Sequence, residues 1–72
     1  MSLLYQKIVK KLTSLKFENR ANFELNKKRL CGEFNIKPTT NQLLLEAYKK
    51  LLKDKKIKRN EALEKFLITR VT

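Results

Sequence analysis

Apolar residues recur at spacings of three and four along almost the whole chain, and no stretch sustains an alternation with a period of two. The first pattern is typical of amphipathic helices, whereas the second is needed for strands with one buried face. The chain also has one glycine and one proline, so it lacks the turn residues that a sheet of many short strands requires. The sequence therefore predicts an all-α fold, a small bundle of about four short helices.

The first two helices are predicted from their apolar stripes and their ends. We expect the first from about Ser2 to Leu15, with one stripe made of Leu4, Ile8, Leu12 and Leu15. Asn22 is a plausible cap for the second helix, and Asn35 can close it in a left-handed conformation. Lys27 lies in the middle of the apolar face of that helix. Its ammonium group is expected to extend to water, or else to be used by a partner.

The third helix has the clearest signals in the chain. Thr39 followed by Gln42 fits a capping box, which predicts a start at about Thr40 and an end at Lys53 or Asp54. Its leucines, Ala47 and Tyr48 fall on one half of the helix surface. Glu46 and the lysines fall on the other half.

A basic loop from Asp54 to Arg59 is expected after the third helix, with Ile57 anchoring it in the core. Asn60 can cap a fourth helix whose buried face is supplied by Leu63, Phe66 and Leu67. Ile68 and Val71 do not fall on that face. Two apolar residues left over in this way suggest that the natural polypeptide continues.

Length and composition bound the class of protein. A chain of 72 residues that is 42% hydrophobic can form one domain over residues 1–72, with a core worth about 3 to 5 kcal/mol. A single cysteine, Cys31, excludes an internal disulfide, and a reducing, cytoplasmic setting is the simplest expectation. No apolar stretch reaches the roughly 20 residues of a membrane span, and no signal peptide begins the chain. Leu3 falls off the first apolar stripe, which would suit a cloning remnant at residues 1–3.

Residues for catalysis and for metal binding are scarce. The chain has no histidine, and its seven carboxylates are dispersed. Glu61 and Glu64 share a helix face, but acidic residues at a helix N-terminus are expected from the helix dipole alone. One thiol cannot build a zinc or iron-sulfur site, and Gly32 is the only glycine that a phosphate-binding loop could use. We predict no catalytic residue and no metal site.

Positive charge is the remaining functional signal. The run KKLLKDKKIKR, residues 49–59, carries seven positive side chains against Asp54, a net of +6 out of +11 for the chain. Lysines placed against phosphates release condensed counterions, so such a run favours a polyanion as partner. If two of the basic clusters of the chain fall on one side, they form a surface on the scale of a folded RNA backbone, which is recognised by its shape and its phosphates. Further clusters lie at Lys27 to Arg29 and on the first helix, at Lys7, Lys10, Lys11 and Lys16. The predicted RNA-binding residues are Lys27, Lys28, Arg29, Lys49, Lys50, Lys53, Lys55, Lys56, Lys58 and Arg59.

The order of residues from Leu25 to Thr72 is more specific than its composition. A basic helix ends in Leu30, Cys31 and Phe34; Pro38 leads into Asn41, Leu44, Leu45 and Tyr48; and KIKRNEALEKFL occupies residues 56–67. In these features the chain resembles the N-terminal region of the Elongator catalytic subunit family. Members of that family are radical-SAM and acetyltransferase enzymes that modify the wobble uridine of tRNA. The resemblance covers about two thirds of the chain.

The resemblance implies a tRNA-binding domain separated from a larger enzyme. The parent family uses an iron-sulfur cluster, S-adenosylmethionine and acetyl-CoA, but none of its catalytic or cluster-binding residues matches a position here. Cys31 is not one of the family's three cluster cysteines. We therefore expect this chain to hold no cofactor and no small-molecule substrate, and to have no enzymatic activity of its own. Its expected partners are tRNA and the catalytic domains that follow in the parent polypeptide, and no membrane.

Two alternatives remain open on the sequence. A DNA-binding module of helix-turn-helix type has a similar size, charge and helix count, but its recognition helix should present Arg, Asn or Gln to base edges. The third helix offers mainly lysines on its exposed side. A protein-docking domain with a basic surface is also compatible, with Ile68 and Val71 packed on a following domain.

Overall fold

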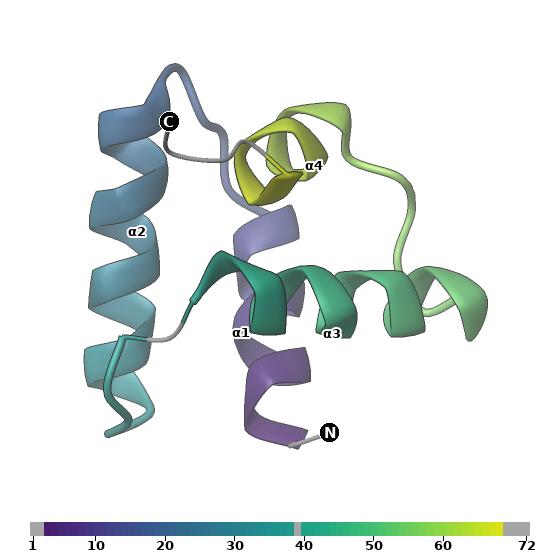
Figure 1. Cartoon of the computed structure of the whole chain (residues 1–72), viewed down its shortest axis with the longest axis horizontal. Helices are drawn as coiled ribbons and strands as arrows, with labels where there is room; N and C mark the ends of the chain where they lie inside the picture. The colour runs from purple at the N-terminus through teal and green to yellow at the C-terminus, as the bar shows by residue number, and fades with distance from the viewer. Residues whose placement is uncertain (1–2, 39, 69–72) are drawn as a thin grey trace.

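The structure, a computed structural model, describes residues 3–38 and 40–68 (Figure 1). Within these residues it contains helices and no strand, so the predicted all-α fold is confirmed. The helices are α1 (Leu3–Thr13), α2 (Arg20–Glu33), α3 (Asn41–Lys53) and α4 (Glu61–Ile68). Thr39 of the predicted capping box and the leftover Val71 lie outside the described residues. Thr40 is the N-cap residue of α3. Its backbone is extended, and its side chain makes no capping hydrogen bond.

Helix α3 is central to the packing. It crosses α1 and also packs against α4, while α2 packs along α1 and touches α4 (Figure 1). Among the described residues, the buried apolar side chains come from all four helices and form a single cluster: Ile8, Val9, Leu12, Phe23, Leu30, Cys31, Leu44, Ala47, Tyr48, Leu51, Leu63 and Leu67. One core of this size orders the whole small domain.

The C-terminal end of α1 differs from the prediction. The helix stops at Thr13, two residues early, where the hydroxyls of Thr13 and Ser14 donate to the carbonyl oxygens of Lys10 and Lys11 at 2.7 Å. Such hydroxyls compete with the backbone for these acceptors and favour an end to the helix. Leu4 and Leu15, which the sequence pattern places on the apolar stripe, are each 38% exposed. The stripe that α1 buries consists of Ile8, Val9 and Leu12.

The predicted cap of α2 was also wrong by three residues. Asn19 is the cap, and its side-chain oxygen accepts a hydrogen bond of 2.9 Å from the backbone N–H of Asn22. Two asparagines three residues apart offer the same capping chemistry, and the earlier one extends the helix by almost a turn. The predicted ends at Asn35 and Asn60 are confirmed. Asn35 is left-handed, with φ 57°, and the side chain of Asn60 accepts from the N–H of Leu63 at 3.0 Å.

Helices α2 and α3 end in the same hydrogen-bonded motif. After α3, the N–H groups of Lys55 and Lys56 donate to the carbonyls of Leu52 and Leu51 at 3.0 and 2.9 Å. This geometry requires a left-handed residue, which here is Lys55 with φ 56°. A side chain with a Cβ pays a penalty in that conformation that glycine avoids.

Replacing Lys55 with Gly is therefore expected to raise the free energy of unfolding by about 1 kcal/mol. Lys55→Ala is the matched control, because alanine removes the same charge but keeps the Cβ. Urea-induced unfolding of the two variants measures the difference. Equal stability of the two would contradict a left-handed conformation at this position.

Candidate nucleic-acid interface

The basic loop and the end of α1 border one surface groove of about 790 Å³, here called the basic groove. Lys10 and the hydroxyl residues Thr13 and Ser14 line it from the α1 side. The loop side and the start of α4 contribute the stretch from Lys56 to Glu61. Lys10 is thus brought to the same surface as Lys56 and Lys58, although nearly fifty residues separate them in the sequence.

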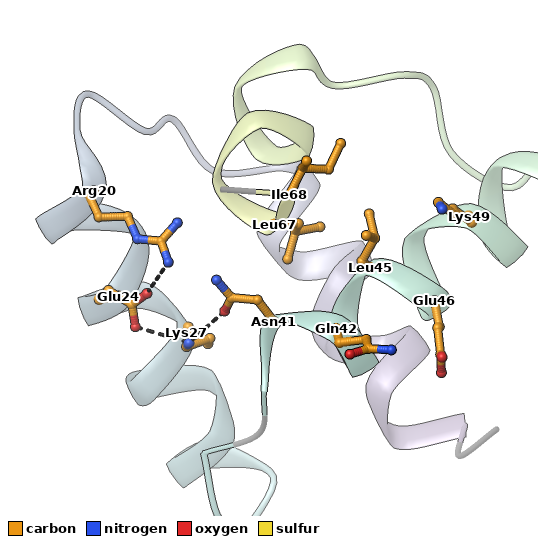
Figure 2. Close-up of a pocket in the computed structure, with 10 residues that line it drawn as sticks. All are labelled: Arg20, Glu24, Lys27, Asn41, Gln42, Leu45, Glu46, Lys49, Leu67 and Ile68. Atoms are coloured by element: carbon orange, nitrogen blue, oxygen red, sulfur yellow. Dashed lines mark hydrogen bonds and ion pairs between the residues drawn. The ribbon is translucent and has the colours of Figure 1, made fainter. Parts of the chain in front are cut away.

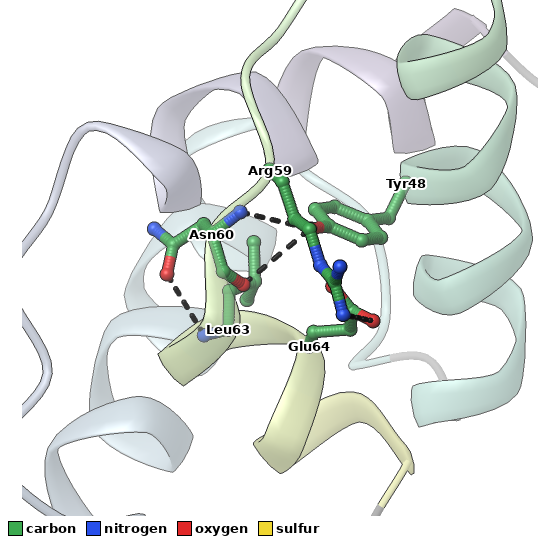
Figure 3. A network of polar contacts seen from close by, with 5 residues as sticks. All are labelled: Tyr48, Arg59, Asn60, Leu63 and Glu64. Atoms are coloured by element: carbon green, nitrogen blue, oxygen red, sulfur yellow. Dashed lines mark hydrogen bonds and ion pairs between the residues drawn. The ribbon is translucent and has the colours of Figure 1, made fainter.

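The loop side of the basic groove is held in place by Tyr48 (Figure 3). The Tyr48 hydroxyl accepts a hydrogen bond from the backbone N–H of Asn60 at 2.9 Å and donates to Oε2 of Glu64 at 3.0 Å. The side chain of Asn60 in turn donates to the Thr13 carbonyl at 3.4 Å. Ile57 packs against the core, as predicted. These contacts tie the loop to α1, α3 and α4, so its lysines project from a defined backbone.

Arg59 and Glu64 form the principal ion pair of this region. Nε of Arg59 donates to Oε2 of Glu64 at 3.1 Å, and Nη2 to Oε1 at 3.4 Å. The hydrogen bond from Arg59, aided by the one from Tyr48, holds the pKa of Glu64 below its ordinary value. The ionised Glu64 carboxylate therefore stabilises the fold at a pH above the pKa that Glu64 has in the unfolded chain. This contribution is lost as the pH falls through the lower pKa of Glu64 in the folded chain.

Tyr48 behaves in the opposite sense. Burial is the main cause that raises the pKa of its hydroxyl. The folded chain favours the neutral form of Tyr48. Its contribution to stability is complete at a pH below the pKa that Tyr48 has in the unfolded chain, and it is lost as the pH rises through the higher pKa of Tyr48 in the folded chain. Near neutral pH both groups hold the loop: Tyr48 as a neutral donor and Glu64 as a carboxylate.

The exposed face of α3 carries a further set of lysines. Lys49, Lys50 and Lys53 are all exposed, and Lys55 follows them at the start of the loop. Lys49 and Lys53 are four residues apart and lie on one stripe of the helix, about 6 Å apart along its axis. In the chain they directly precede Lys56 and Lys58 of the basic groove.

The predicted cluster on α2 lies elsewhere. Helix α2 and the loop between α3 and α4 are at opposite sides of the molecule (Figure 1). Lys28 and Arg29 are exposed, but Lys27 is buried. Its ammonium group donates to Oδ1 of Asn41 at 2.9 Å and pairs with Glu24 at 3.0 Å (Figure 2). The expectation that this group extends to water is wrong, because a glutamate on its own helix and an asparagine on α3 surround it.

Lys10 is the residue that the sequence prediction missed. The sequence places Lys10 in a basic cluster on the first helix but gives no reason to assign it to the site. Its position on the outward side of α1 was visible in the helical pattern, yet nothing local shows that this end of α1 packs beside the loop. Only the crossing of α1 and α3 brings it there.

Within the described residues, no three His, Cys, Asp or Glu side chains are grouped so as to hold a metal ion. No helix in the same part of the chain is long and apolar enough to cross a membrane. Comparisons of the chain with protein-family models, with curated proteins and with solved structures gave no match.

Proposed function

We propose that this chain is a tRNA-binding module that grips the phosphate backbone on the basic groove and the exposed face of α3. The observation that carries the proposal is the meeting of Lys10 with Lys56 and Lys58 across one groove. Cations from two distant segments on one side of a small domain concentrate the field that attracts a polyanion. Each lysine that replaces condensed counterions at a phosphate adds affinity without reading a base.

The type of side chain on this surface favours the backbone as the target. Lysine presents a flexible point charge, whereas the base edges of duplex DNA are read mainly by Arg, Asn and Gln. Arg59, the one arginine among the described residues that line the basic groove, is engaged by Glu64. The surface is therefore suited to following the shape of a folded RNA.

The choice of tRNA among RNAs rests on the resemblance of residues 25–72 to the Elongator catalytic subunit family. In that setting the module would position the tRNA for wobble-uridine modification in the cytoplasm. The chemistry would belong to the radical-SAM and acetyltransferase domains of the parent enzyme. The present chain would bind and orient its substrate.

The test is a titration of labelled tRNA with the chain over a series of salt concentrations. For about five phosphate contacts, the logarithm of the association constant should fall with the logarithm of salt at a slope of about −3 to −5. Duplex DNA of equal length should compete more weakly than tRNA at one ionic strength. A slope near zero would rule out backbone binding, and preferred binding of the duplex would favour the helix-turn-helix alternative.

A further inference from the structure

A second groove, of about 730 Å³, lies between α2, the first turns of α3 and the end of α4 (Figure 2). One of its sides is apolar and is formed by Leu45, Leu67 and Ile68. Ile68 is 54% exposed, although it is a large aliphatic residue in a helix. The volume of the second groove lies within the range of pockets that hold small organic groups.

The opposite side of the second groove is polar and internally braced. Arg20 pairs with Glu24 at 3.2 Å and also donates to the carbonyl of Phe66 near the end of α4. Asn41 donates to the same carbonyl at 3.2 Å while accepting from Lys27. These bonds connect α2, α3 and α4, so the groove exists before any ligand arrives. Preformed sites lose less entropy on binding than sites that must be ordered.

The groove opens onto the cationic face of α3. Lys49 lines its rim together with Gln42 and Glu46. From Lys49 the stripe continues along α3 to Lys53, so a phosphate chain lying along this stripe would pass the mouth of the groove. The rim also offers an amide and a carboxylate, which can donate to and accept from the polar edge of a base.

We propose that the second groove receives a single unstacked nucleobase from a loop or single-stranded part of the RNA bound along α3. This inference rests on the proposed function, and it adds to the RNA-binding surface a contact that does not depend on charge. The apolar wall would cover one face of the base, while Gln42 and Glu46 would meet its edge. A peptide partner would fill the same volume, but the line of lysines leading away from the rim matches a repeating phosphate and not a peptide.

The test uses a single-stranded RNA that carries a fluorescent adenine analogue, and the variant Ile68→Ser. Leu25→Ser is the matched control, because Leu25 is 55% exposed against 54% for Ile68 and does not line the groove. Ile68→Ser should weaken binding about five- to tenfold, with the salt slope unchanged because no phosphate contact is lost. The change in fluorescence on binding should be reduced with it. Gln42→Ala, at an exposed position, should change the preference among the four bases.

The two proposals fail in different ways. If Ile68→Ser and Leu25→Ser bind alike while the steep salt slope persists, the nucleobase site is wrong and backbone binding stands. Equal binding of fully paired RNA and loop-containing RNA would also overturn the nucleobase site. If the unaltered chain shows no salt dependence, the proposed function itself is wrong. If a peptide bound to the chain, Ile68→Ser weakened that binding and RNA did not compete with it, the groove would be reassigned to a protein partner.

Discussion

Tyr48→Phe is expected to lower the free energy of unfolding by about 1 to 3 kcal/mol, although it removes one oxygen atom. Tyr48 is 1% exposed, and its hydroxyl bonds to two partners, the backbone N–H of Asn60 and the carboxylate of Glu64. Without the hydroxyl, the N–H of Asn60 loses its acceptor and Glu64 loses a donor. A buried group left without a partner costs more than an average hydrogen bond contributes.

Tyr48→Ala should have a larger effect, about 3 to 5 kcal/mol, because it also leaves a cavity at the centre of the core. That is comparable with the whole stability expected of a chain of this length. This variant should therefore be largely unfolded at room temperature. Urea-induced unfolding followed by circular dichroism measures both variants against the unaltered chain.

Tyr5→Phe is the control for the loss of a hydroxyl, because Tyr5 is only partly buried and takes no part in the loop network. Its cost should stay within about 0.5 kcal/mol. Tyr48→Phe should also reduce RNA affinity without removing a charge, since the loop that carries Lys56 and Lys58 is less firmly held. Equal stability of the two Tyr→Phe variants would show that the Tyr48 network does not hold the loop.

The features that the sequence predicted correctly are those that local chemistry controls. Asn35 and Asn60 end and begin helices through their own backbone and side-chain geometry, and Ile57 is the only apolar residue in a charged loop. Signals of this kind need no knowledge of the rest of the fold. The four helices follow from the spacing of apolar residues for the same reason.

The features that were missed depend on which helices become neighbours. The helical pattern placed Lys27 on an apolar face, but the acceptor that fixes its ammonium group is Asn41, fourteen residues away on another helix. Lys10 joins the basic groove only because α1 ends beside the loop. Charge runs in a sequence therefore predict only the sign of a partner, whereas tertiary packing decides which cations lie together and which are already paired.

The triple variant Lys10→Ala, Lys56→Ala and Lys58→Ala is expected to reduce tRNA affinity on the order of 100-fold at low salt, about fivefold for each lysine. All three side chains are exposed, so the free energy of unfolding should change little. The loss of three phosphate contacts should also make the salt slope shallower by about 2 to 3. Affinity and slope come from the same titrations of labelled tRNA.

The matched control replaces Lys7, Lys28 and Lys37 with alanine. These residues are also exposed lysines, and they lie outside the basic groove. Both triple variants lower the net charge by the same amount, so any loss due to the overall field should be equal in the two. Only the groove variant should lose specific contacts, and its affinity should fall at least tenfold further than that of the control. Equal losses would mean that the chain attracts RNA by net charge alone and that the groove formed by α1 and the loop has no special role.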